Sequence, residues 1–161
     1  MRAGPRTAFA IVALACAAAL AAALVSQHVF EMQPCPWCVL QRLVFVLIGL
    51  VGLAGALSPR PMPWRVCAAL AGALGAAGVA IALWQHFVAA SSASCDLTLA
   101  DRIMSGTGLD MALPQVFAAF ASCADAKVNL LGVPYEFWSL ALYAAMAAAA
   151  AWIWREAGAR R

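Results

Sequence analysis

The sequence contains very little charge. Only 11% of its 161 residues are Asp, Glu, Lys or Arg, whereas 66% are hydrophobic. A soluble domain needs more polar surface than this, so the composition indicates an integral membrane protein. The formal net charge of +3 is too small to indicate a nucleic-acid partner, and we expect none.

The sequence also lacks the alternating polar and apolar pattern of membrane-spanning strands. Only helices and closed barrels cross a bilayer, because the hydrocarbon offers no water to bind backbone groups. Four apolar stretches lie at residues 8–27, 39–57, 65–88 and 136–154, and a spanning helix needs about 20 residues. We therefore predict a single all-α membrane domain over residues 1–161, a four-transmembrane-helix bundle.

The distribution of basic residues predicts the orientation of this bundle. Lys and Arg concentrate at the two termini and in the short link 58–65, whereas loops 28–38 and 89–135 hold most of the acidic residues. By the positive-inside rule, both termini lie in the cytoplasm. The two longer loops then face outward.

Glycines recur at helical spacing on two of the predicted helices. Such stripes allow membrane helices to approach closely, so we interpret them as packing surfaces. The glycines are Gly49, Gly52 and Gly55 on the second helix and Gly72, Gly75 and Gly78 on the third. The proline-rich link 58–65 is short, which makes these two helices antiparallel neighbours.

Six cysteines divide between helices and loops. Cys16 and Cys67 fall in predicted helices and are most simply small packing residues. The remaining four, all in the outward loops, are Cys35, Cys38, Cys95 and Cys123. Disulfides persist outside the cytoplasm, four cysteines allow three connectivities, and two structural disulfides are one interpretation. A bond across the CxxC pair would brace almost nothing, however, and such a pair favours redox chemistry.

The surroundings of Cys38 favour its thiolate form. Cys38 lies near the N-terminus of the second predicted helix, where unpaired N–H groups and the macrodipole stabilise negative charge. Arg42 follows four residues later and therefore on the same helical face. A charge at membrane depth is usually functional, although an Arg there can instead extend to lipid headgroups.

Other cysteine chemistries fit the sequence less well. A metal site would need His28 or His86 beside the CxxC pair, and neither stands at a recognised ligand spacing, so we predict no metal. Covalent haem attachment requires His directly after the second Cys, where Val39 stands. A soluble thioredoxin-like domain requires βαβ patterning, which is absent.

These features resemble the disulfide-bond formation protein B (DsbB) family over nearly the whole chain. The resemblance rests on Pro-Cys-x-x-Cys-x-x-x-Arg opening the second helix and on the Cys95 and Cys123 pair in the second loop. Shorter matching pieces are Gln85-His86, Cys95-Asp96, Pro114-Gln115-Val116-Phe117 and Leu131-Gly132. The vitamin K epoxide reductase type is a rival, but it usually places its CxxC near a later helix.

The resemblance implies a thiol:quinone oxidoreductase of the bacterial inner membrane, with its redox cysteines facing the periplasm. Such an enzyme reoxidises a DsbA-type periplasmic thiol oxidase and passes the electrons to membrane quinone, ubiquinone or menaquinone. The alternatives are a non-enzymatic membrane protein with two structural periplasmic disulfides and a soft-metal binding protein.

The resemblance also implies roles for individual residues. A partner thiolate would attack Cys95, and the freed Cys123 would attack Cys35. Cys38 would then be left as a thiolate beside the quinone. These four cysteines are the predicted catalytic residues, and the predicted quinone-binding residues are Cys38, Arg42 and His86.

Overall fold

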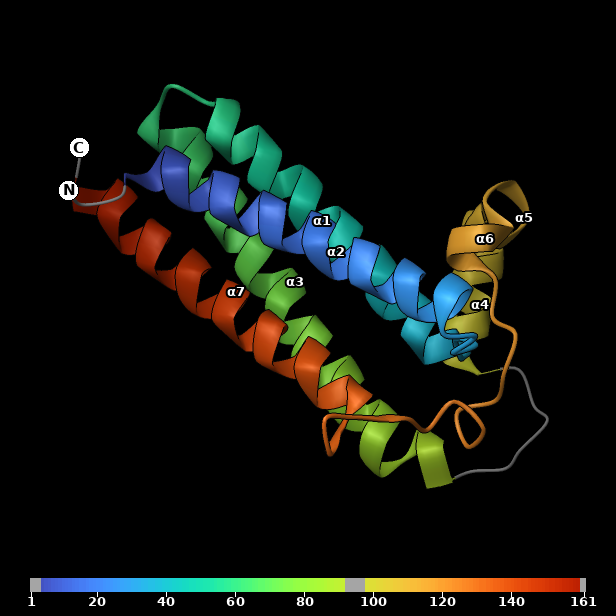
Figure 1. The fold of residues 1–161 in the computed structure, drawn as a ribbon. Helices are drawn as coiled ribbons and strands as arrows, with labels where there is room; N and C mark the ends of the chain where they lie inside the picture. Colours follow the sequence, from blue (N-terminus) through green and yellow to red (C-terminus); the bar gives the residue numbers. More distant parts are fainter. Residues whose placement is uncertain (1–3, 92–97, 160–161) are drawn as a thin grey trace.

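Four long helices make up most of the structure (Figure 1). This computed structural model describes residues 4–91 and 98–159 of the chain. Helices α1 (Pro5–Val29), α2 (Pro36–Leu57), α3 (Pro61–Phe87) and α7 (Tyr135–Ala159) are each long and apolar enough to cross a membrane. The predicted all-α membrane bundle of four helices is therefore confirmed.

Prolines define where three of these helices begin. Pro5, Pro36 and Pro61 each occupy the first turn of their helix, where the fixed φ of proline suits the helix and its missing N–H costs nothing. The helices consequently start a few residues before the apolar stretches that predicted them. For α2 the earlier start brings Cys38 into the first turn of the helix.

Short elements fill the connection between α3 and α7. They are a 3₁₀ turn (η1, Ala89–Ser91), α4 (Leu99–Thr107), α5 (Leu109–Ala112), α6 (Pro114–Phe117) and the strands β1 (Asn129–Leu130) and β2 (Val133–Pro134). A capping box between Thr98 and Asp101 starts α4. The antiparallel strands turn through Leu131 and Gly132, whose φ values of 56° and 80° match the left-handed backbone of a two-residue hairpin.

The spanning helices pack as two close pairs, α1 with α2 and α3 with α7, and α2 also contacts α3. A Cβ on Gly52 would lie only 3.1 Å from the Phe9 carbonyl oxygen of α1. A Cβ on Gly75 would lie 3.3 Å from the Tyr143 carbonyl oxygen of α7. The two glycine stripes are therefore packing surfaces, as predicted, and each faces the other member of its own pair.

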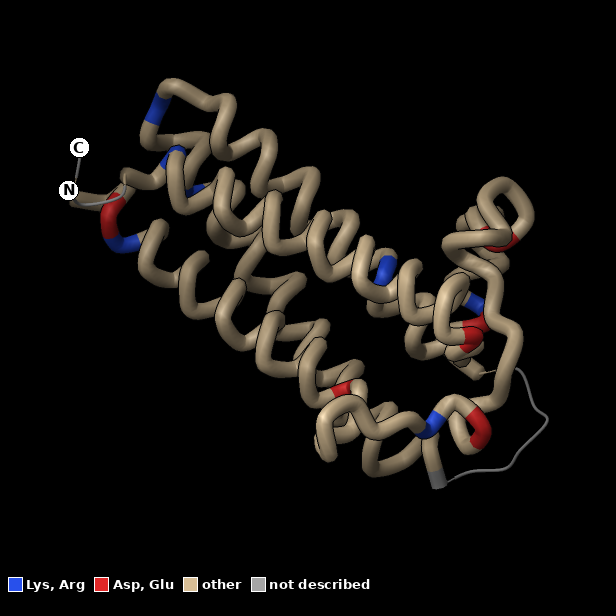
Figure 2. The backbone as a smooth tube through the Cα atoms, in the orientation of Figure 1, with Lys and Arg blue, Asp and Glu red and all other residues tan. Residues whose placement is uncertain are grey.

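Charge is confined almost entirely to the two ends of the bundle. Figure 2 shows Lys and Arg gathered where the termini and the α2–α3 link lie, and long uncharged stretches between the ends. Arg42, in the second turn of α2, departs from this pattern because it is buried within the bundle. A buried charge needs hydrogen-bonding partners, and those of Arg42 lie at the candidate functional site.

The contact between Gly78 and Tyr143 provides a test of this packing. A Cβ at position 78 would overlap the Tyr143 ring, whereas a Cβ at position 72 would meet the Ala150 Cβ at an ordinary 3.6 Å. We expect Gly78→Ala to destabilise the bundle by about 1–3 kcal/mol, the usual cost of overpacking. Gly72→Ala, the matched control on the same helix face, should be neutral or slightly stabilising. Thermal unfolding in detergent measures both, and equal midpoints would contradict the predicted difference.

Candidate functional site

Three of the four predicted catalytic cysteines meet at the N-terminus of α2. Cys35 is the N-cap residue, held in extended conformation before Pro36, and its sulfur accepts the backbone N–H of Cys38 at 3.4 Å. The Cys35 and Cys38 sulfurs lie 2.9 Å apart. Cys35 also hydrogen-bonds Cys123, from the distant second loop. Cys95 lies outside the described residues.

The second loop is tied to the first loop just before Cys123. The Pro34 carbonyl oxygen accepts the backbone N–H groups of Phe120, at 3.0 Å, and Ala121, at 3.3 Å. The backbone N–H of Trp37, in the first turn of α2, in turn hydrogen-bonds Cys123. Residues far apart in sequence are thus fixed side by side, with Cys123 next to the buried Cys35.

The two loop cysteines of this cluster differ electrostatically. The hydrogen bond from Cys35, supported by the Trp37 N–H, lowers the pKa of Cys123. Hydrogen bonding to Cys123 and Cys38, together with burial, raises the pKa of Cys35. The thiolate is the nucleophile in disulfide exchange, so the arrangement favours Cys123 as the attacking group and Cys35 as its target.

Arg42 directs its guanidinium into the protein. The residue is only 5% exposed, and Nη1 donates to Gln27 Oε1 at 2.6 Å and to the Val116 carbonyl oxygen at 2.8 Å. Nη2 donates to the Ala23 carbonyl oxygen at 3.3 Å. These bonds use three of its five N–H donors and join α2 to both α1 and α6. The alternative of a side chain extended to lipid headgroups does not match this geometry.

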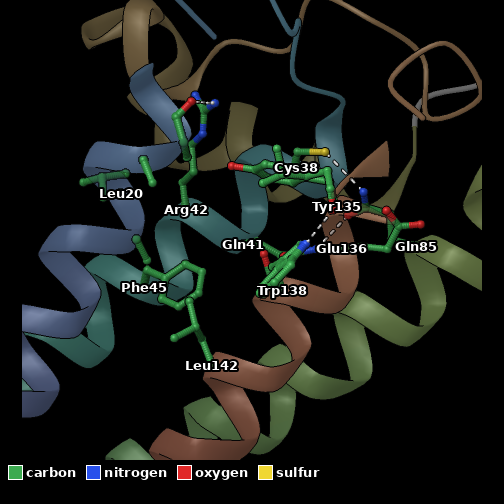
Figure 3. A pocket seen from close by; sticks show the side chains of 15 residues that line it. Leu20, Cys38, Gln41, Arg42, Phe45, Gln85, Tyr135, Glu136, Trp138 and Leu142 are labelled. Atoms are coloured by element: carbon green, nitrogen blue, oxygen red, sulfur yellow. Dashed lines mark hydrogen bonds between the residues drawn. The ribbon is translucent and has the colours of Figure 1, made fainter. Parts of the chain in front are cut away.

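A cavity of about 210 Å³ lies between the two helix pairs (Figure 3). Its polar side groups come from Cys38, Gln41, Arg42, Gln85, Tyr135, Glu136 and Ser139. Its larger apolar side chains are Leu20, Phe45, Leu130, Trp138 and Leu142. The hairpin β1–β2 contributes Leu130, and the bundle contributes the rest. The cavity is therefore lined by large apolar side chains together with polar groups that include the Cys38 sulfur.

His86 does not line this cavity. Its Nδ1 lies 2.7 Å from Glu136 Oε1, and Glu136 is itself a lining residue. His86 instead borders a second, outer cavity of about 370 Å³ with Lys127 and Asn129. His86, which the sequence predicted to bind quinone, is thus separated from the cavity by the Glu136 carboxylate.

Sequence reasoning missed five polar lining residues: Gln41, Gln85, Tyr135, Glu136 and Ser139. Gln41 and Gln85 are buried on α2 and α3. A useful signal was present, because polar side chains at membrane depth are costly and usually functional. Within the part of the chain that the structure describes, no three His, Cys, Asp or Glu residues are arranged to hold a metal ion.

The chain matches known proteins over most of its length. The family model described as "Disulfide bond formation protein DsbB" matches residues 5–153. A disulfide bond formation protein B from Stutzerimonas stutzeri is 33% identical over 154 residues, which cover 93% of this chain and 94% of that protein. One from Dechloromonas aromatica is 30% identical over 144 residues, covering 87% and 86%. Another, from Verminephrobacter eiseniae, is 34% identical over 145 residues, covering 87% and 80%.

The hydrogen bond from Cys35 to Cys123 predicts a measurable change in thiol reactivity. In Cys35→Ala this bond is lost, so the pKa of Cys123 should rise and its alkylation should require higher pH. Iodoacetamide labelling of the reduced protein across a pH series, read by peptide mass spectrometry, measures this shift. Cys67, near the opposite end of the bundle, serves as the reference in the same molecules. An unchanged pH profile for Cys123 would show that the bond has no electrostatic effect.

Proposed function

The chain belongs to the DsbB family of disulfide-forming membrane proteins, and on this premise we propose that it is a thiol:quinone oxidoreductase. Its proposed substrate is the reduced form of a DsbA-type periplasmic thiol oxidase, and its electron acceptor is ubiquinone or menaquinone. The observation that carries the proposal is the contact of Cys35 with both Cys38 and Cys123. One buried sulfur can thereby exchange between two partners.

The burial of Cys35 supports a relay through two cysteine pairs. Cys35 is 0% exposed, so a folded partner protein cannot reach its sulfur directly. Cys95 and Cys123 are the proposed outer pair that the partner reduces. The Cys123 thiolate then attacks Cys35, the bond between Cys35 and Cys38 breaks, and its electron pair stays on the Cys38 sulfur. Each exchange step replaces one disulfide by another through a mixed disulfide.

The cavity beside Cys38 fits the head of a quinone. Its volume of about 210 Å³ is below the roughly 300–1,000 Å³ of sites that enclose a whole drug-sized ligand. It would thus hold a ring whose long apolar tail lies in the lipid. Phe45 and Leu142 would pack on the ring, while Arg42 and Tyr135 would bind its oxygens. A bound quinone supplies a two-electron acceptor next to Cys38.

The structure alters the role that we propose for His86. Because Glu136 separates His86 from the cavity, we propose that His86 orients this carboxylate and does not bind the quinone ring directly. Of these two residues, Glu136 would then be the one that faces the quinone ring.

The distribution of charge supports a bacterial inner-membrane location with both termini in the cytoplasm. Basic residues gather at the end of the bundle that carries the termini (Figure 2), which is the cytoplasmic pattern. The cysteine cluster lies at the opposite end and would face the periplasm. Disulfide chemistry is normally confined to that side.

Two structural disulfides account less well for this geometry. A structural cysteine needs one fixed partner, whereas Cys35 contacts both Cys38 and Cys123. The cluster is also adjacent to a cavity that reaches Cys38 and Arg42. Both observations favour disulfide exchange over a purely structural role for these cysteines.

The relay is tested by removing its outer pair. In membranes that contain quinone, Cys95→Ala and Cys123→Ala should each abolish oxidation of reduced DsbA-type protein, because the partner cannot reach Cys35. Cys67→Ala, which removes a cysteine far from the cluster, should retain wild-type turnover. The assay follows quinol formation under anaerobic mixing. Full turnover of that substrate by the Cys95→Ala/Cys123→Ala double variant would refute the relay.

The role of Arg42 is tested by the conservative change Arg42→Lys. Lysine keeps the charge but cannot reproduce the fork of donors, so we expect the KM for quinone to rise about tenfold, equivalent to roughly 1.4 kcal/mol. Quinol formation at varied quinone concentration measures the KM. A thermal melt of the same variant reports loss of the bonds to Gln27 and Val116. An unchanged KM with a lowered melting point would leave Arg42 a structural role only.

A further inference from the structure

Two buried glutamines face each other across the helix interface beside Cys38. Gln41 on α2 is 4% exposed and Gln85 on α3 is 8% exposed. The Nε2 of Gln41 donates to the Oε1 of Gln85 at 2.7 Å. Burying an amide in an apolar bundle is costly unless its polar atoms are paired. This bond satisfies one end of each amide. The Nε2 of Gln85 still needs a hydrogen-bond acceptor.

That remaining donor is directed at the redox sulfur. The Nε2 of Gln85 lies 3.2 Å from the Cys38 sulfur (Figure 3). A neutral thiol is a weak acceptor, so a hydrogen bond to neutral Cys38 offsets little of the free energy needed to bury the Gln85 amide. A thiolate is a much better acceptor, because hydrogen bonds to a charged atom are roughly twice as strong. The contact therefore strengthens when Cys38 becomes negative.

The direction of the Gln85 amide is fixed by its neighbour. Gln41 occupies the oxygen end of Gln85, so the nitrogen end must face Cys38. The Tyr143 hydroxyl also donates to this turn of α2, at the Gln41 backbone carbonyl oxygen 2.8 Å away, but it bonds neither side-chain amide. Without Gln41, the two ends of the Gln85 amide could exchange places.

Arg42 does not substitute for this donor. Its guanidinium donates to Gln27, Ala23 and Val116, and it acts on Cys38 through its charge. Within residues 4–91 and 98–159, the side-chain hydrogen bond that reaches the Cys38 sulfur from another helix is the one from Gln85.

We propose that Gln85 is a catalytic residue that stabilises Cys38 as a leaving thiolate, and that Gln41 is a positioning residue that orients the Gln85 amide. The inference rests on the proposed function, in which the Cys123 thiolate attacks Cys35 and the Cys35–Cys38 bond breaks. The electron pair of that bond goes to the Cys38 sulfur, and no proton is needed. A disulfide opens faster when its leaving thiolate is better stabilised.

The test measures Cys38 itself and does not require quinone. The fully reduced wild-type protein and Gln85→Leu are labelled with iodoacetamide at pH 6, where an ordinary thiol is almost wholly protonated and the rate follows the thiolate fraction. Peptide mass spectrometry reads Cys38 and Cys67 in the same molecules. We expect Cys38 to react about tenfold more slowly in Gln85→Leu, the effect of losing one hydrogen bond to a charged group. Cys67 should react at an unchanged rate.

Two further variants separate positioning from general packing. Gln41→Leu should slow Cys38 by a smaller factor, about threefold, because the Gln85 donor remains but is no longer oriented. Tyr143→Phe also removes a buried hydrogen bond to this turn of α2, yet it leaves both amides intact, so Cys38 should react as in wild type. Gln85→Met replaces Gln85→Leu if the latter does not accumulate in membranes.

A second pH distinguishes ionisation from accessibility. At pH 10 an ordinary thiol is largely ionised in every variant, so the Cys38 rates should converge. Equal rates at pH 6, or a difference that persists at pH 10, would overturn the assignment of Gln85. Failure of the wild-type protein to oxidise a reduced DsbA-type partner would instead refute the proposed function, and the labelling result would still be readable.

Discussion

The burial of the Arg42 guanidinium is the constraint around which the functional end of the bundle is arranged. A guanidinium remains charged at any physiological pH, so within a membrane bundle it must be surrounded by acceptors. The chain supplies them from three elements: Gln27 and the Ala23 carbonyl on α1, and the Val116 carbonyl on α6. Meeting this need draws the second loop down onto the start of α2. The same loop segment, held further by the Pro34 carbonyl, leads directly to Cys123.

Close packing elsewhere leaves space where the chemistry is proposed. The glycine stripes bring α1 against α2 and α3 against α7, whereas α1 and α7 contact one another at few positions. The two pairs meet through α2 and α3, where Gln41 bonds Gln85, and through the stacking of Phe45 on Tyr143. Near the cysteine cluster a cavity remains between the pairs. Small residues thus determine which helices pair closely, and the candidate site lies between the pairs.

Much of this architecture is readable from the sequence, and the reasons are local. Long apolar stretches predict the spanning helices because the bilayer leaves few alternatives, and the prolines at their starts explain the error in their first residues. The choice of candidate redox cysteines follows from a motif, but the convergence of Cys35, Cys38 and Cys123 depends on backbone contacts, such as that of Pro34 with Phe120, which no spacing predicts. His86 shows the limit most clearly. Its position at the end of α3 is predictable, yet whether it faces the cavity or Glu136 depends on how α7 packs beside it.

Three polar groups around the cavity share one physical property, which is that each is buried against a specific partner. Arg42 is held by Gln27, Gln41 by Gln85, and Glu136 by His86. Polar networks in a medium of low dielectric constant are costly when incomplete and rigid when complete. A rigid network stabilises new charge without rearranging, which is how preorganised sites lower barriers. In the proposed reaction, negative charge passes from Cys123 to Cys38 across Cys35. Fixed donors already stand at both ends of that path, the Trp37 N–H at Cys123 and the Gln85 amide at Cys38. The charge therefore moves between two prepared positions, and the buried Cys35 between them is shielded from thiols in solution.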